Sequence, residues 1–224
     1  MTRFRIRRVD RWPWIVALTA LLMAGGCDDT AEGDDDDGSG GSGTGGTASG
    51  SGGATGGGGG SGGMLPFALT STAFAEGDTI PQQYECGAPA PVTGPGQNLT
   101  PPLSWTPGPP GTLSYAVVTK DLTAGITHWA IYDIPAVVTS LPEGIPDGYQ
   151  PANPGGSKQA EIQGSGWYGY FGPCSPSSIN TYQWTVHALP SEALPGVDMS
   201  TTETNVAAAI EGASIASASL SGQS

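Results

Sequence analysis

A 26-residue tract that contains sixteen glycines limits which part of this chain can fold. The tract covers residues 38–63, and its other residues are Ser, Thr and Ala. It has no apolar periodicity from which a core could be built. We interpret residues 27–63, including an acidic cluster at 34–37, as a disordered tether with a span of about 30–36 Å. A single globular domain is therefore predicted over residues 64–224, enough to bury about two-thirds of its unfolded-state surface.

The first 26 residues have the pattern of an export signal. All five arginines lie between Arg3 and Arg11, and an apolar run from Trp12 to Ala24 follows them. A run of about 13 residues is shorter than the roughly 20 that a membrane-spanning helix needs. The pattern therefore favours a cleaved signal peptide over residues 1–26 rather than a stable transmembrane helix.

The end of this segment indicates a site of lipid attachment. Small residues stand directly before Cys27 in the sequence Leu22-Met-Ala-Gly-Gly-Cys27. This resembles the lipobox of bacterial lipoproteins, although Ala24 stands where that motif usually has Leu. We therefore predict that Cys27 is acylated. This modification would supply the two or more acyl chains that stable anchoring takes. The protein would then be an exported lipoprotein of the cell envelope, periplasmic or on the cell surface. The alternative is an ordinary signal peptide with an incidental cysteine.

The predicted domain is strongly acidic. From residue 64 onward it has two basic residues, Lys120 and Lys158, against twelve carboxylates, which gives a net charge of −10. Such a surface repels nucleic acid and anionic lipid headgroups, so we expect no nucleic-acid partner and contact with the membrane only through the lipid anchor. With two histidines and no second cluster of ligands, we predict no metal site and no cofactor.

Short apolar or alternating segments between Pro- and Gly-rich connections predict strands. The predicted strands cover residues 67–70, 103–105, 113–119, 128–134, 182–189 and 215–220. One helix is predicted, capped by Thr201 or Thr202, with Glu203 in its first turn and Gly212 at its end. This order favours a mainly β fold, an antiparallel β sandwich with few short helices and one near the C-terminus.

Seven stretches across the domain carry a family resemblance. They are Phe67-Ala-Leu-Thr-Ser-Thr-Ala-Phe74, Gly77-Asp-Thr-Ile-Pro81, Asn98-Leu-Thr-Pro-Pro-Leu-Ser-Trp105, Ser114-Tyr-Ala-Val-Val-Thr-Lys-Asp121, Thr127-His-Trp-Ala-Ile-Tyr-Asp-Ile-Pro135, Gly169-Tyr-Phe-Gly-Pro-Cys174 and Tyr182-Gln-Trp-Thr-Val-His-Ala-Leu189. In this order and spacing they resemble the bacterial, Raf kinase inhibitor-like branch of the phosphatidylethanolamine-binding protein (PEBP) family. The resemblance implies an antiparallel β fold with a small pocket for phosphate-like or other anionic groups.

The resemblance also implies which residues form the pocket. The first pocket motif of the family begins Asp-Pro-Asp-Ala, and here it reads Asp121-Leu-Thr-Ala, followed after a shortened loop by the motif histidine, His128. The second motif begins with Gly172-Pro173 and ends with Tyr182. Within it, Asn180 stands where the family usually has a second histidine. The implied ligand-binding residues are Asp121, His128, Gly172, Pro173, Asn180 and Tyr182.

We expect Asp121, His128 and Tyr182 to converge at one small opening. An imidazole and a phenol can donate hydrogen bonds to an oxyanion, and a neighbouring carboxylate can orient the imidazole and favour its protonated state. Asn180 donates without charge, so one bond of roughly 1.5–3 kcal/mol falls to about 1 kcal/mol, and anion affinity should be weaker than in relatives. The alternative for His128 is a ring that only fills a strand position, which is how we interpret His187.

Two cysteines remain in the domain if Cys27 is acylated. Export places Cys86 and Cys174 where disulfides persist, and we hypothesise that they form a bridge. Because Cys174 follows Gly172 and Pro173 directly, such a bridge would stiffen the pocket wall.

Two functions stay open at this point. The first is a surface-anchored, non-catalytic binding module for a small ligand that carries phosphate or carboxylate. The second is inhibition of a protease or another enzyme through the Pro- and Gly-rich surface loops, in which case the partner is a protein. Inhibition of this kind is known among members of the family. Hydrolysis with His128 as general base needs an activated nucleophile and an oxyanion site, and the sequence displays neither clearly, so we predict no enzyme activity.

Overall fold

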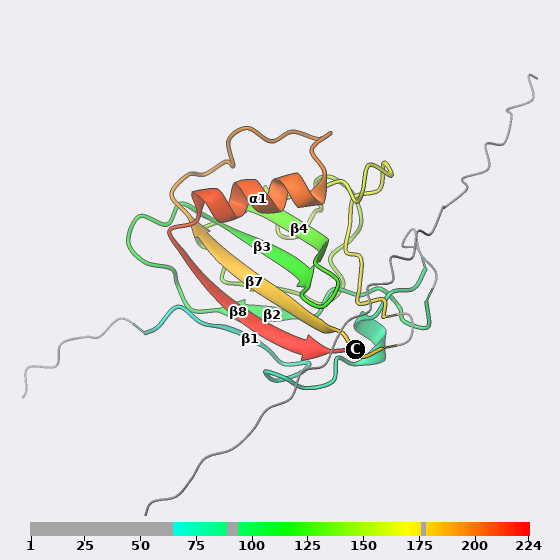
Figure 1. Cartoon of the computed structure of the whole chain (residues 1–224). Helices are drawn as coiled ribbons and strands as arrows, with labels where there is room; N and C mark the ends of the chain where they lie inside the picture. Colours follow the sequence, from blue (N-terminus) through cyan, green and yellow to red (C-terminus); the bar gives the residue numbers. More distant parts are fainter. Residues whose placement is uncertain (1–64, 89–93, 176–177) are drawn as a thin grey trace, which may run out of the picture. The chain divides into compact units, whose positions relative to one another are not determined.

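The computed structural model describes residues 65–88, 94–175 and 178–224. The predicted signal peptide (1–26), Cys27 and the whole predicted tether (27–63) lie outside these described residues. The described part consists mainly of two antiparallel sheets with one α-helix near the C-terminus (Figure 1). In these ranges, no helix has the length and apolar character needed to span a bilayer.

The larger sheet brings the predicted pocket residues to one of its ends. Its order is β6 (Lys158–Gln159), β4 (Ile126–Pro135), β3 (Ser114–Asp121), β7 (Thr181–Leu189) and β8 (Ala216–Gln223), with every neighbouring pair antiparallel. Asp121, the last residue of β3, pairs with Ile126 on one side and with Tyr182 on the other. The turn between β3 and β4 contains Gly125, whose φ of 70° favours glycine.

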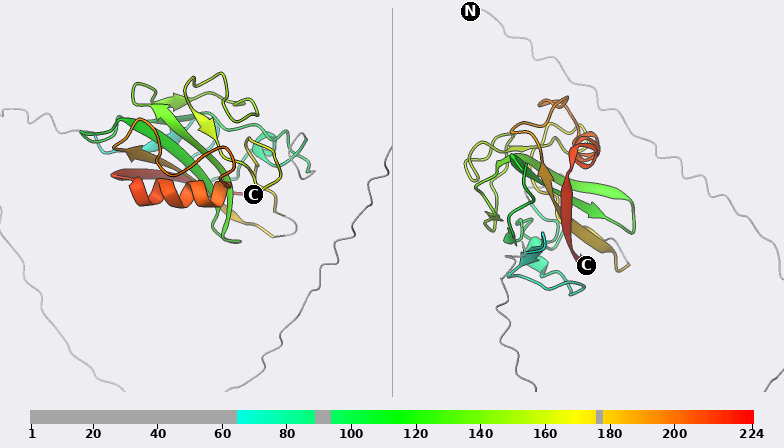
Figure 2. Two further views of the ribbon diagram at one scale, coloured as in Figure 1. Left: turned by 90° about the horizontal axis from the view of Figure 1, so that it is seen from above. Right: turned by 90° about the vertical axis from the view of Figure 1, so that its left-hand side faces the viewer.

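The two faces of the larger sheet are covered by different elements. The smaller sheet, β1 (Leu69–Ser71), β2 (Leu103–Trp105) and β5 (Ser140–Leu141), shares the main apolar core with one face. The helix α1 (Glu203–Ala213) packs Val206, Ala207 and Ile210 against the other face (Figure 2). A short 3₁₀ helix, η1 (Gln82–Tyr84), follows β1. Strand β3 is therefore buried on both faces, which explains the uninterrupted apolar run Tyr115–Val118 at its centre.

Most of the predicted elements are present with shifted ends. The six predicted strands correspond to β1, β2, β3, β4, β7 and β8, whereas β5 and β6 have two residues each and are too short to produce a periodic pattern. The predicted end of the helix was wrong, because Gly212 lies inside α1 and Ser214 follows as the C-cap. Gly212 does not take the positive φ by which glycine usually ends a helix. Thr202 is the N-cap, but its side chain forms no capping hydrogen bond.

Replacing Gln159 by alanine should destabilise the fold strongly. Its buried amide accepts a hydrogen bond from Trp129 Nε1 at 2.8 Å and donates to the carbonyls of Pro146 and Gly148, each at 2.9 Å. The substitution leaves three groups unpaired, so we expect a loss of about 3 kcal/mol or more in the free energy of unfolding in urea. Gln183→Ala, whose side chain is only partly buried, is the matched control and should cost about 0.5 kcal/mol. Equal losses in the two variants would contradict this account.

Candidate ligand pocket

A pocket of about 520 Å³ opens at the end of the larger sheet where β3 turns into β4. Its polar lining residues are Asp121, Thr123, His128, Gln163, Ser178 and Asn180, and its other lining residues are Ala124, Ile126, Phe171 and Cys174. These residues include no Lys or Arg, so His128 is the lining residue that can become positively charged. In the described ranges, no three His, Cys, Asp or Glu side chains lie close enough together to hold a metal ion.

The Asp121 carboxylate is buried and already holds the turn that follows it. Its Oδ1 accepts hydrogen bonds from the backbone N–H groups of Thr123 and Ala124, both at 2.8 Å, and its Oδ2 accepts one from Asn180 Nδ2 at 2.7 Å. Burial alone would raise the pKa of Asp121, but the bonds from Ala124, Asn180 and Thr123, together with the Tyr182 hydroxyl, outweigh burial and lower the pKa below 3.8. Asp121 is therefore ionised at neutral pH and its oxygens are occupied by donors.

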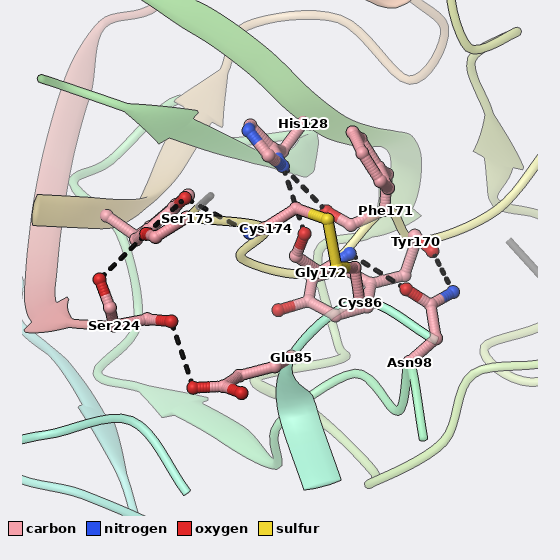
Figure 3. The surroundings of a disulfide bond; sticks show 11 residues. Glu85, Cys86, Asn98, His128, Tyr170, Phe171, Gly172, Cys174, Ser175 and Ser224 are labelled. Atoms are coloured by element: carbon pink, nitrogen blue, oxygen red, sulfur yellow. Dashed lines mark hydrogen bonds between the residues drawn. A yellow bond between two sulfur atoms is a disulfide. The ribbon is translucent and has the colours of Figure 1, made fainter. Parts of the chain in front are cut away.

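His128 is oriented by backbone carbonyls, and the expectation that Asp121 would orient it was wrong. Its Nδ1 lies 3.0 Å from the Phe171 oxygen and 3.2 Å from the Gly172 oxygen (Figure 3). Both oxygens can only accept, so Nδ1 carries a proton and Nε2 is the nitrogen left for the pocket. Burial lowers the pKa of His128 below 6.5, and the two carbonyls and the charge of Asp121 only partly oppose this effect. Asp121 favours the protonated state, as expected, but burial outweighs it, so the ring is mainly neutral at pH 7.

Two aromatic rings fix the plane of the His128 imidazole. The Phe171 ring stacks on it with a centroid distance of 4.7 Å and an interplanar angle of 10°. The Tyr182 ring meets it edge to face at 5.2 Å and 90°. Together with the bonds at Nδ1, these contacts give Nε2 a single direction.

Tyr182 lies against Asp121 and His128 but is not one of the residues that line the pocket: its ring contacts that of His128, and its hydroxyl helps to lower the pKa of Asp121. Its side chain is fully buried in the main core, and its hydroxyl accepts a hydrogen bond from the Cys174 N–H and contacts Ser175 Oγ, both at 3.1 Å. The alternation of β7 places Tyr182 on the same face of the sheet as Trp184 and Val186, in the main core. Of the six implied residues, three line the pocket, namely Asp121, His128 and Asn180, and three build the wall behind it, namely Gly172, Pro173 and Tyr182.

The wall behind His128 is held by a disulfide and by one asparagine. Cys86 and Cys174 are joined in the structure (Figure 3), with 5.2 Å between their Cα atoms. The Cys86 N–H donates to the Pro173 oxygen at 2.8 Å. Asn98 accepts a hydrogen bond from the Gly172 N–H at 2.9 Å and donates to the Tyr170 oxygen. The carbonyls that orient His128 therefore belong to a segment with little freedom.

Sequence reasoning missed several lining residues. Thr123 and Ala124 lie in the turn after Asp121, and Ile126 begins β4 two residues before His128; their position between two predicted site residues is a signal that could have found them. Gln163 and Ser178 lie outside the motifs of the resemblance. Only the folded chain brings these two residues to the pocket.

Comparison with known proteins places the chain in a family. A family model described as phosphatidylethanolamine-binding protein matches residues 70–224. The chain belongs to the phosphatidylethanolamine-binding protein family.

A UPF0098 protein of Methanothermobacter thermautotrophicus is 34% identical over 157 residues, which cover 69% of this chain and 95% of that protein. LppC of Mycobacterium tuberculosis, a protein named as a lipoprotein, is 33% identical over 130 residues, 56% of each chain. The crystal structure of Escherichia coli YbcL, described as a new member of the mammalian PEBP family, is similar with a TM-score of 0.56 and 28% identity over 71% of this chain and 98% of YbcL.

Removal of the disulfide should weaken the domain. We expect the double replacement of Cys86 and Cys174 by serine to lower the free energy of unfolding by about 2–5 kcal/mol, because the bridge closes a long loop of the unfolded chain. In the unaltered protein, an alkylating reagent should add mass at these positions only after reduction. Alkylation of both cysteines without reduction would contradict the bridge.

Proposed function

We propose that this protein is an exported, lipid-anchored binding module whose pocket holds the phosphate or carboxylate group of a small ligand without catalysing a reaction. The observation that carries the proposal is the nitrogen Nε2 of His128, left for the pocket by the bonds of Nδ1 to two carbonyls. Membership of a family named for ligand binding supports the binding role. The likeness to LppC supports the lipid anchor.

Anion binding in this pocket requires a proton. The free pocket holds a neutral His128 beside an ionised Asp121 and no basic lining residue, so an anion would first meet repulsion. When Nε2 takes up a proton, the imidazolium can donate a charge-assisted hydrogen bond to an anionic oxygen. The bonds that Asp121 accepts from Thr123, Ala124 and Asn180 offset part of its negative charge. Binding and protonation of His128 are therefore coupled.

The hydroxyls near His128 support a role without catalysis. Thr123 Oγ1 accepts a hydrogen bond from the Thr181 N–H at 2.9 Å, and Ser178 Oγ donates to Asn180 Oδ1 at 3.1 Å. Neither hydroxyl is paired with the imidazole, as an activated nucleophile would be. The thiol of Cys174 is consumed by the disulfide.

Propyl phosphate should bind at His128. We expect its titration into the protein to shift the ring resonances of His128 in NMR spectra, because the phosphate oxygen accepts a hydrogen bond from Nε2. His128→Gln should abolish saturable binding. His187→Gln is the matched control, since His187 is also buried but does not line this pocket, and it should bind as the unaltered protein does. No shift at His128 at any propyl phosphate concentration would remove the proposal.

The affinity for a carboxylate should rise as the pH falls. Benzoate stays ionised between about pH 5 and pH 8, whereas the pKa of His128 lies below 6.5 in the free protein and should rise when an anion is bound. Between these two pKa values each pH unit downward should increase the association constant by up to about tenfold, with a plateau once free His128 is protonated. Calorimetry across this range measures the slope. An affinity that is independent of pH would contradict proton uptake at His128.

A second candidate, inhibition of an enzyme by surface contact, is favoured by apolar side chains near the pocket. Leu122, Ile126 and Ile179 are exposed by 49, 42 and 74%, and the Leu122 N–H donates to the oxygen of Thr181, close to Ile179 in the chain. Exposed apolar groups that gather on one surface favour protein contacts. Exported proteases that keep full activity in an excess of the protein would argue against this function.

A further inference from the structure

Three residues other than glycine have a left-handed backbone in the described part of the chain. They are Asn98, Asp133 and Gln163, with φ values of 56°, 58° and 50°. This conformation is unfavourable for a residue with a Cβ atom, although Asn and Asp tolerate it better than most. Glycine adopts this conformation at a lower energetic cost. A residue with a side chain at such a position therefore needs an explanation.

The side chains of Asn98 and Asp133 have a structural reason. Asn98 is buried and bonds to the Gly172 N–H and the Tyr170 oxygen. Asp133 is buried and accepts hydrogen bonds from the Leu194 N–H at 2.7 Å and from Lys158 Nζ at 2.8 Å. In both cases the fold would lose two polar contacts if the side chain were removed.

Gln163 has no such reason within the fold. Its side chain is exposed, lines the ligand pocket and forms no hydrogen bond with the described residues. The next left-handed positions of the same loop are glycines, Gly164 with a φ of 67° and Gly166 with a φ of 76°. The loop thus uses glycine where only the backbone conformation matters, and glutamine at the position beside the pocket.

Contacts with buried residues hold the backbone of Gln163 in this conformation. Its backbone N–H donates to Glu203 Oε2 at 2.7 Å, and Glu203 is buried at the first turn of α1. The preceding residue, Ile162, is buried and its N–H donates to the Trp167 oxygen at 2.9 Å. An unfavourable backbone conformation that buried groups maintain is typical of positions that serve a ligand.

We propose that Gln163 is a ligand-contact residue that determines specificity, its carboxamide binding a hydroxyl or similar polar group of a ligand whose anionic group is held at His128. This inference rests on the proposed function. A carboxamide both donates and accepts, so it suits a hydroxyl better than a second anion. The chemical class of ligand is therefore a phosphate or carboxylate with a hydroxylated organic part.

Two phosphate esters that differ only in their hydroxyls test this assignment. Glycerol 1-phosphate and propyl phosphate have the same three-carbon ester, and we expect the unaltered protein to bind the glycerol ester about fivefold more tightly, the value of one neutral hydrogen bond. Gln163→Gly should bring the affinity for glycerol 1-phosphate down to that for propyl phosphate and leave propyl phosphate unchanged. The same variant should melt about 2 °C higher, because the strain at this position is relieved.

Asp133→Gly is the matched control at a left-handed position away from the pocket. Asp133 lies seven residues from Ile126 on β4, about 23 Å along the strand. This variant should melt several degrees lower, because two buried polar contacts are lost, and should keep the preference between the two esters. If the unaltered protein binds neither ester, the proposed function itself fails. If it binds them equally, or if Gln163→Gly keeps the preference or melts as low as Asp133→Gly, the pocket stands and the role of Gln163 is overturned.

Discussion

The burial of β3 on both faces is the constraint on which the rest of the structure depends. Seven of its eight residues are buried, and β4 and β7 pair with it along its whole length. A buried strand must have its backbone groups paired, and this pairing ends where the chain turns after Asp121. Beyond that point the N–H groups of Thr123 and Ala124 find their acceptor in the Asp121 carboxylate. The polar edge of the pocket thus arises from the way the central strand ends.

The same requirement sets the chemistry of His128. The segment from Tyr170 to Gly172 lies outside the named strands, so several of its backbone groups bond to side chains instead. Two of its carbonyls select the proton position on His128, and burial of the ring keeps the imidazole neutral. An ionised Asp121 beside a neutral His128 is therefore a consequence of folding. This charge state is the reason that the proposed binding of an anion includes the uptake of a proton.

The sequence alone predicted the strands well where burial produces a pattern. Strands β3, β4 and β7 are long apolar or alternating segments, and their predicted ends differ from the structure by no more than two residues. The place of Tyr182 was harder to predict, because the family resemblance assigned it to the pocket, whereas in the structure its ring is buried in the core with Trp184 and contacts the His128 ring from there. Gln163 could not be found, because its conformation depends on Glu203, forty residues later in the chain.

The scarcity of basic residues explains how this acidic domain builds its loops. Its two lysines are engaged in ion pairs, Lys158 with Asp133 and Lys120 with Glu211. The buried carboxylates of Asp121 and Glu203 therefore depend on backbone N–H groups, from Thr123 and Ala124 in one case and from Gln163 in the other. Hydrogen bonds to buried carboxylates are screened by salt less than exposed ion pairs are. Both loops that border the pocket are fixed by this kind of bond, so the shape of the pocket should depend less on ionic strength than the exposed ion pair of Lys120 and Glu211 does.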